Sequence, residues 1–275
     1  MKTRSEDLQN LGELKRRQYA DLGWCAFDYD PFLHRWVQHA EPVAREELAE
    51  EKSSDWIRCN GTWYVGVNAL NNDETGRLKQ GPPFSSEAIR FISETFGFDD
   101  IVWDRAQISV CYPGYPQRSA DEADSAYNYR LRRDAAHVDG LLPEGPTRRR
   151  HLREHHSFVL GIPMMEHSEA SSPLVMWEGS HHIVREKFGA FYKEFPPNEW
   201  GNQDVTELYN ETRKTIFEQC KRVVIMGRPG ETYLLHRLTL HGIAPWKEKG
   251  QNDPYRMVCY FRPELSSPED WLFQP

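Results

Sequence analysis

The chain has 275 residues, of which 39% are hydrophobic and 28% are charged, a composition that excludes a disordered or fibrous protein. Its 34 basic and 42 acidic residues give a net charge of −8, which argues against broad binding to nucleic acid or to an anionic membrane. We therefore expect a small molecule as the partner. A chain of this length buries a sizeable core by itself, so a bound metal would serve function rather than folding.

Five cysteines are scattered without paired spacing, which favours reduced thiols and a cytoplasmic location. The first 20 residues carry charges throughout and lack the apolar core of a signal peptide. The longest aliphatic runs, such as 223–226, are too short to span a membrane. We expect a cytoplasmic protein that binds neither a membrane nor nucleic acid.

The first hundred residues predict mainly helices. Apolar residues near helical spacing indicate a helix over 6–22, followed by a short strand over 25–29. Asp30 before Pro31 is a typical N-cap pair and opens a second helix that runs to about residue 50. A third helix starts at Ser85 and ends at Gly97.

From about residue 101 the pattern changes to short β-type runs bounded by glycine or proline. They cover 106–112, 157–162, 174–177, 223–226, 232–235 and 255–261, and one helix capped by Asp204 interrupts them over 205–220. Such spacing favours a sandwich or barrel over a parallel α/β fold. We predict one mostly β domain over 1–275, with a helical cover over about 1–100 and a β core over about 101–263.

The candidate metal site begins at His137-Val138-Asp139. Residues two apart in a strand point to one face, so His137 and Asp139 could bind one metal ion together. A distant histidine, for which His241 is the candidate, would complete a 2-His-1-carboxylate face with open positions on ferrous iron. The triplet alone is weak evidence, but its order with His241 and Arg256 is harder to obtain by chance.

Further motifs share this order along the chain. They are Tyr112-Pro113-Gly114-Tyr115-Pro116, Gly179-Ser180-His181 and Gly230-Glu231-Thr232, beside His137-Val138-Asp139-Gly140, His241-Gly242 and Arg256. Together they resemble the phytanoyl-CoA dioxygenase superfamily of Fe(II)- and 2-oxoglutarate-dependent oxygenases over about residues 101 to 263. The resemblance implies a double-stranded β-helix, the cupin-like jelly roll, with flanking helices.

The resemblance also implies a reaction and the residues for it. His137, Asp139 and His241 would be the catalytic metal ligands for Fe(II), with 2-oxoglutarate as cosubstrate and dioxygen as oxidant. The reaction would hydroxylate a small organic molecule while 2-oxoglutarate is decarboxylated. Halogenating members have a small residue at the carboxylate position, so Asp139 favours hydroxylation.

Arg256, Gln107 and Tyr112 are the candidate contacts to 2-oxoglutarate. Arg256 shares strand parity with Arg262, and an interior guanidinium needs a carboxylate partner. The far carboxylate of 2-oxoglutarate would fit the fork of Arg256, and an internal salt bridge is the alternative. Structural pairing is the alternative for Gln107 and Tyr112.

Two positions depart from the family pattern. Ile243 stands where a small hydroxyl residue would contact the cosubstrate, and a polar loop over Lys247 to Asp253 lengthens the gap from His241 to Arg256. His236 competes with His241 as metal ligand, but the two are five residues apart, so a regular strand turns only one inward. Gly242 and the family pattern favour His241, which leaves His236 as a packed strand histidine.

The segment 130–154 is basic in an acidic chain. Seven arginines stand there against four acids, and either they attract an anionic substrate or they are solvated and paired with acidic helices. His151 and His155 would share a helical face and could bind zinc, although the His-Glu-x-x-His order is absent. Two other functions stay open: a cupin-like metal enzyme without 2-oxoglutarate, and a non-catalytic jelly-roll binding module.

Overall fold

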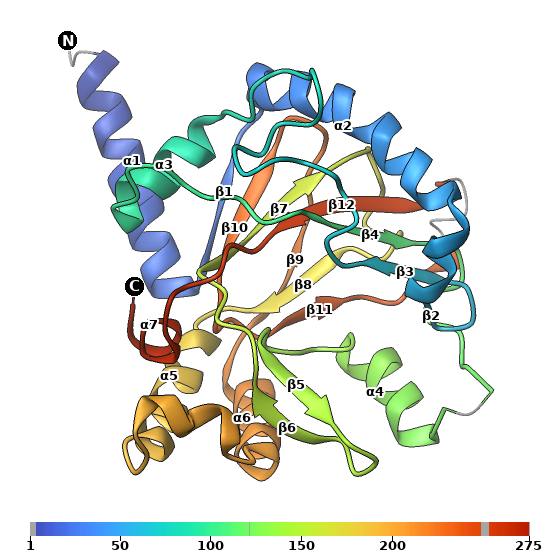
Figure 1. The fold of residues 1–275 in the computed structure, drawn as a ribbon, viewed down its shortest axis with the longest axis vertical. Helices are drawn as coiled ribbons and strands as arrows, with labels where there is room; N and C mark the ends of the chain where they lie inside the picture. The colour runs from blue at the N-terminus through green and yellow to red at the C-terminus, as the bar shows by residue number, and fades with distance from the viewer. Residues whose placement is uncertain (1–3, 121, 249–252, 275) are drawn as a thin grey trace.

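The structure, a computed structural model, describes residues 4–120, 122–248 and 253–274. Two antiparallel sheets form its centre and helices pack around them (Figure 1). Most of the polar loop expected over 247–253 lies outside the described residues. Within the described ranges, no helix has the length and apolar character needed to cross a membrane.

The larger sheet has seven strands in the order β1-β10-β7-β12-β4-β3-β2. They are β1 (Trp24–Phe27), β2 (Ile57–Arg58), β3 (Trp63–Gly66), β4 (Gln107–Cys111), β7 (Phe158–Pro163), β10 (Thr232–His236) and β12 (Arg256–Phe261). The smaller sheet has the order β11-β8-β9, formed by β11 (His241–Ile243), β8 (Leu174–Trp177) and β9 (Arg222–Ile225). From β4 onward the chain passes repeatedly between the two sheets, which is the topology of a jelly roll.

Strand β12 shows how the sequence pattern separates the two faces of the larger sheet. Met257, Cys259 and Phe261 pack in the core beneath the N-terminal helices. The alternate residues Val258 and Tyr260 pack between the two sheets, because side chains of a strand point to opposite faces in turn. All residues of β12 are buried, so both faces of the strand are covered.

Helices α1 (Arg4–Leu22), α2 (Pro31–Ala49) and α3 (Glu87–Phe96) cover the outer face of the larger sheet (Figure 1). Asp30 caps α2 by accepting hydrogen bonds from the backbone N–H groups of Phe32 and Leu33. Gly97 ends α3 in the left-handed conformation at φ 69°. Both helix boundaries fall on the residues expected from the sequence.

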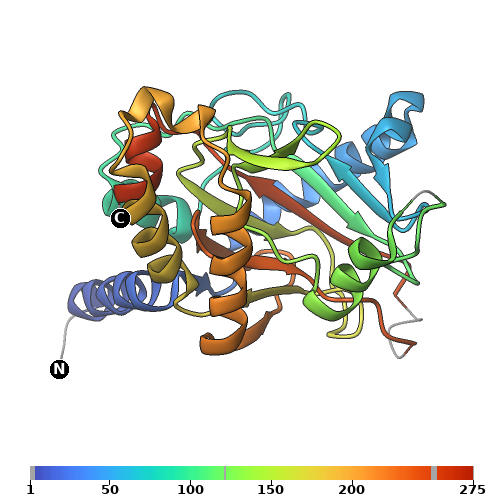
Figure 2. The ribbon, with the colours of Figure 1, turned by 90° about the horizontal axis from the view of Figure 1, so that it is seen from below.

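A second group of helices packs around the opposite end of the sandwich (Figure 2). It comprises α5 (Ser180–Tyr192), α6 (Thr206–Gln219) and α7 (Pro268–Phe273), with α4 (Asp124–Arg133) and the 3-10 helices η1 (Glu51–Trp56) and η2 (Pro197–Asn202) elsewhere along the chain. A hairpin of β5 (Leu141–Glu144) and β6 (Arg149–Leu152) directly follows the His-x-Asp triplet.

Two fold predictions need correction. The jelly-roll core is present as predicted, but strands do not dominate the chain, since 37% of it is helical and 22% lies in strands. Helices α4 and α7 were not predicted because their sequences lack a clear apolar stripe, and α5 was missed because Gly179-Ser180 was interpreted as a turn. The strand expected over 25–29 is present as β1, but β2 and β3 were not expected within the N-terminal cover. Strand β1 pairs with β10 and β3 pairs with β4, so both extend the larger sheet.

Candidate metal centre and cavity

Backbone pairing brings His137 and His241 together. Each of the two residues donates its backbone N–H to the carbonyl of the other, at 2.7 and 3.0 Å, and they form an isolated antiparallel bridge beside β11. Directly paired residues place their side chains on the same face of a sheet. The imidazole rings accordingly lie with their centroids 4.6 Å apart.

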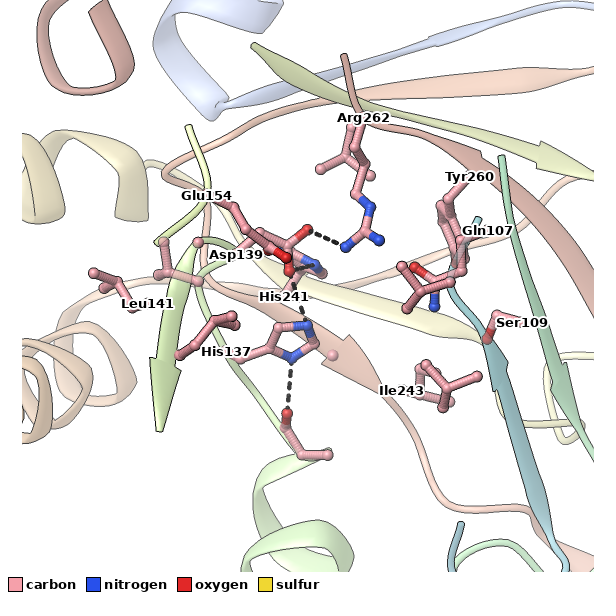
Figure 3. Close-up of a pocket in the computed structure, with 18 of the residues that line it drawn as sticks. Gln107, Ser109, His137, Asp139, Leu141, Glu154, His241, Ile243, Tyr260 and Arg262 are labelled. Atoms are coloured by element: carbon pink, nitrogen blue, oxygen red, sulfur yellow. Dashed lines mark hydrogen bonds and ion pairs between the residues drawn. The ribbon is translucent and has the colours of Figure 1, made fainter. Parts of the chain in front are cut away.

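Asp139 joins this pair from the same segment as His137 (Figure 3). Its Oδ1 lies 3.2 Å from Nε2 of His137 and 3.8 Å from Nε2 of His241. One potential ligand atom from each of the three residues lies within 4.8 Å of the others. The structure therefore gathers the three predicted ligands, and their nitrogen and oxygen atoms suit a divalent transition metal.

The backbone orients both histidines for ligation through Nε2. Nδ1 of His137 lies 3.0 Å from the carbonyl oxygen of Ala135, and Nδ1 of His241 lies 2.9 Å from that of Thr239. A carbonyl oxygen only accepts, so each Nδ1 must be the donor, and Nε2 of the neutral ring keeps its lone pair. This arrangement is typical of metal-bound histidines.

Electrostatics keeps the carboxylate charged. Burial alone would raise the pKa of Asp139, but the nearby His241, His137 and Arg262 outweigh it and hold the pKa well below the usual value. Burial also lowers the pKa of His241 to about 4. At neutral pH the site thus presents one carboxylate and a neutral His241, which are the protonation states that metal binding requires.

The three residues line a cavity of about 420 Å³. Its buried wall is mainly apolar and includes Val159, Leu174 and Leu235, with Gln107 and Ser109 as polar members. Ile243 also lines it, so the position at which the family pattern calls for a hydroxyl is apolar here. A cavity of this size and character suits a small organic molecule.

The structure brings one of the two weaker cosubstrate candidates to the cavity and not the other. Gln107 points into it from β4 (Figure 3). Tyr112 lies just beyond the end of β4, does not line the cavity and packs against Tyr255, with ring centroids 6.1 Å apart. The prediction for Tyr112 is wrong because its parity in the strand is opposite to that of Gln107.

Arg256 is buried at the start of β12, with 1% of its surface exposed. One guanidinium nitrogen donates to the hydroxyl of Tyr260 at 3.1 Å, while Nε and Nη1 find no acceptor within the described part of the chain. No ion pair with an acidic side chain accompanies it within those residues, so the alternative of an internal salt bridge is not realised there. Arg256 does not itself line the cavity, whereas Tyr260, the acceptor of its hydrogen bond, does.

Three residues near the metal site were not predicted from the sequence. Arg262 lines the cavity, with Nη1 3.5 Å from Oδ2 of Asp139. The sequence indicated only that Arg262 shares strand parity with Arg256 and could face the interior. Glu154 also lines the cavity, and its carboxylate lies 3.0 Å from Nε2 of His156. Tyr209 on α6 accepts a hydrogen bond from the backbone N–H of Val138 at 3.2 Å; no signal near the motif could have revealed it.

The competing histidines lie elsewhere. His236 is buried beside Arg185, whose Nη2 lies 2.8 Å from its Nε2, and beside the rings of Tyr19 and His181. His151 belongs to strand β6, so the helical face expected for His151 and His155 does not exist and the zinc alternative is wrong.

The fold is shared with solved enzymes. The structure matches the non-heme alpha ketoglutarate dependent carbocyclase SnoK from nogalamycin biosynthesis with a TM-score of 0.54 and 14% identity, over 94% of this chain and 85% of that one. It matches the non-heme alpha ketoglutarate dependent epimerase SnoN from nogalamycin biosynthesis with a TM-score of 0.51 and 13% identity, over 92% and 82%.

A third match is SnoN in complex with Fe3+, alpha ketoglutarate and nogalamycin RO, with a TM-score of 0.50 and 13% identity, over 94% of this chain and 86% of that one. Neither the family models nor the curated proteins that were searched gave a match. These neighbours are alpha ketoglutarate dependent enzymes, the class that the sequence resembles, and identities this low establish the fold alone.

Proposed function

We propose that the protein is a non-haem Fe(II)- and 2-oxoglutarate-dependent dioxygenase that hydroxylates a small organic molecule. The observation that carries the proposal is the convergence of Nε2 of His137, Nε2 of His241 and Oδ1 of Asp139 at the wall of a cavity. Two imidazoles and one carboxylate on one side of an ion would leave the opposite positions open, as oxygenase chemistry needs.

The fit of 2-oxoglutarate is supported by the unsatisfied guanidinium of Arg256. Nε and Nη1 are buried without an acceptor among the described residues. Burying an unpaired charge costs about several kcal/mol of folding free energy. A carboxylate would satisfy both donors as a bidentate pair. Tyr260 and Tyr233, whose hydroxyls are 3.1 Å apart, stand beside Arg256 and would frame the same carboxylate.

When bound, iron and 2-oxoglutarate supply the oxidising chemistry that converts a C–H bond to an alcohol at the expense of dioxygen. His137, Asp139 and His241 would hold the metal, and the carbonyls of Ala135 and Thr239 fix the two rings in the ligating orientation. The apolar wall of Val159, Leu174 and Leu235 would exclude water from the reacting centre. Asp139 supports hydroxylation over halogenation, because its carboxylate would itself bind the metal where halogenating members have a small residue.

The test is the weak visible charge-transfer band that forms when Fe(II) and 2-oxoglutarate bind together without oxygen. Wild-type protein should give the band, Asp139→Ala should abolish it, and Arg256→Met should require at least roughly tenfold more 2-oxoglutarate. Arg149→Met is the matched control, since Arg149 is an arginine paired with Asp204 and Glu207 away from the cavity. Circular dichroism of each variant checks that the fold persists.

The same titration separates the alternatives. Metal binding without the band would identify a cupin-like metal enzyme that does not use 2-oxoglutarate. Absence of any metal binding would identify a non-catalytic binding module and refute the proposal.

A further inference from the structure

We infer that the substrate carries an apolar body and an anionic group, and that Arg148 and Arg150 of the β5–β6 hairpin bind the anionic group. The inference takes the cavity as the substrate site and in that respect rests on the proposed function. It decides between the two interpretations of the basic segment 130–154, because the structure divides these arginines into paired and unpaired ones.

Three of the seven arginines of the segment have acidic partners. Arg149 pairs with Asp204 at 2.5 Å and Glu207 at 3.3 Å, Arg153 pairs with Glu144 at 2.5 Å, and Arg130 pairs with Glu122. These three arginines therefore match the alternative in which the basic segment is solvated and paired with acidic residues. Arg149 does not line the cavity, so its charge is not available to a molecule there.

Arg148 and Arg150 are different. Both line the cavity. Arg150 does so because its parity on β6 is opposite to that of Arg149, and Arg148 lies in the turn that precedes the strand, with φ 52°. Neither has an ion pair among the residues that the structure describes. Their charges therefore face the cavity without a counter-ion, whereas the intervening arginine is neutralised on the other side of the hairpin.

The surroundings of Arg150 make it a built site rather than a free surface charge. Its guanidinium lies 4.6 Å from the ring centroid of Tyr209, and Nη1 donates to the carbonyl of Leu141 at 2.5 Å. Arg213 lies against the same ring at 4.4 Å. Burial, together with the charges of Arg213 and Arg148, lowers the pKa of Arg150, which is the signature of clustered cations that an anion would relieve.

The hairpin connects this cluster to the metal centre. Leu141, whose carbonyl accepts a hydrogen bond from Arg150, is the second residue after Asp139. The chain turns at Gly140, with φ 86°, so the two residues lie at most roughly 7 Å apart. The ring of Tyr209 carries Arg150 while its hydroxyl accepts from the N–H of Val138. An anion held by Arg150 would thus lie about one small molecule away from the metal ligands.

The rest of the cavity indicates what is attached to the anionic group. Its deep wall is formed by buried apolar side chains such as Val159, Leu174 and Leu235, whereas Arg148 is exposed and Arg150 half-buried. A molecule with its charge at the rim and its apolar part inside matches this division. Shape and charge together favour a carboxylate, sulfate or phosphate ester of an apolar compound.

The test is calorimetric titration of the metal-free protein with octanoate, octyl phosphate and the neutral octanamide. Wild type should bind both anions at least roughly tenfold more tightly than the amide. Salt at about 0.5 M should reduce this difference in affinity, because it screens the charges at the partly exposed rim. The double variant Arg148→Met/Arg150→Met should lose the preference, and Arg149→Met should keep it. Because no metal is present, the result does not depend on the iron chemistry.

Several outcomes would overturn the inference. Equal affinity for octanamide and octanoate, no binding of any of the three, or an equal loss of preference in Arg149→Met would each do so. Displacement of octanoate by 2-oxoglutarate from metal-free wild type would also do so, because the arginines would then belong to the cosubstrate site. If wild type lacks the iron–2-oxoglutarate band yet prefers anions, the proposed function fails and the anion site stands.

Discussion

The phenolic oxygen of Tyr209, on α6, accepts the backbone N–H of Val138, the residue that separates the two ligand side chains His137 and Asp139. Both groups are buried, so the bond fixes the backbone of the metal-binding segment to a helix some seventy positions downstream. Metal sites depend on such supporting contacts nearly as much as on the ligands themselves.

Tyr209→Phe should therefore weaken metal binding while leaving the ligands in place. Loss of a bond to a buried N–H costs about 1–3 kcal/mol of unfolding free energy, and loss of a supporting contact lowers metal affinity by roughly 10- to 100-fold. Fe(II) titration and urea unfolding would measure the two effects. Tyr192→Phe is the control, because the buried hydroxyl of Tyr192 has no hydrogen-bond partner among the described residues; an equal loss in both variants would contradict the assigned role.

Gly242→Ala should disrupt the pairing of the two histidines. A Cβ at this position would lie 2.2 Å from the carbonyl oxygen of Asp134 and 3.1 Å from Cα of Ala136, both backbone atoms. The strand would have to move away from the His137 segment, at a cost of about 1–3 kcal/mol for overpacking. Thermal unfolding and metal titration should both show the loss.

Gly12→Ala is the matched control for that change. Gly12 lies within α1, and its added Cβ would meet only the end of the Arg16 side chain, at 3.9 Å. Alanine favours a helix interior over glycine by about 1 kcal/mol, so this variant should be slightly more stable than wild type. Similar melting temperatures for the two variants would refute the steric argument.

Arg237 should be among the most sensitive positions of the chain outside the cavity. Its fully buried guanidinium donates to the carbonyls of Ser157, Trp271, Asp270 and Gln274 and so attaches α7 to β7 and β10. Arg237→Met should cost about 3–5 kcal/mol, because four backbone carbonyls lose their buried donor together. Limited proteolysis should release the C-terminal segment in this variant before the β core is cleaved, and cleavage at wild-type rates would count against the attachment.

Acid should destabilise the protein in a way that depends on His181. Burial lowers the pKa of His181 to about 4 in the folded protein, whereas the unfolded chain titrates near 6.5. As the pH falls from 6.5 towards 4, the unfolded state binds more protons than the folded state, so the free energy of unfolding decreases over this window. Above pH 6.5 the contribution of His181 to stability is fully present. The loss attributable to His181 is at most about 3 kcal/mol, at about 1.4 kcal/mol for each pKa unit.

Urea unfolding at pH 7, 6, 5 and 4.5 would measure this slope. His181→Gln, which retains a donor for the carbonyl of Ala20 that Nε2 of His181 bonds at 2.9 Å, should unfold with a shallower dependence on pH. Identical slopes in the two proteins would show that His181 is not a source of the acid sensitivity.

Local patterns predicted the parts of the fold that depend on neighbouring residues. The strand over 174–177 is marked by a short continuous apolar run, the cap at Asp30 by capping chemistry and the stop at Gly97 by a positive φ, and the structure has all three there. The hairpin over 141–152 and helix α5 were missed. Arginine-rich strands carry no apolar alternation, and the turn signal at Gly179-Ser180 proved to be the start of a helix.

The candidate site shows the same division. His137, Asp139 and His241 were predicted because two of them are neighbours and the third stands in a motif. The contacts of Arg262 with Asp139 and of Tyr209 with Val138 join segments far apart in the chain, which periodicity does not report. The opposite orientations of Arg149 and Arg150 follow from strand parity, but β6 itself was not predicted. Tyr112 failed for a simpler reason: its place relative to the end of β4 decides which face it takes.

Strand β1 has a consequence for how the N-terminal segment can be shortened. It occupies the outermost place in the larger sheet, and its only sheet partner among the described strands is β10. Removing residues 1–28 would uncover the backbone donors and acceptors of β10, a five-residue strand that is buried throughout. Bare edges of this kind recruit other chains, so the truncated protein should self-associate, and light scattering that detects only monomer-sized particles would contradict this expectation. The first helix and strand thus protect the edge of β10 from pairing with other chains, in addition to covering the core.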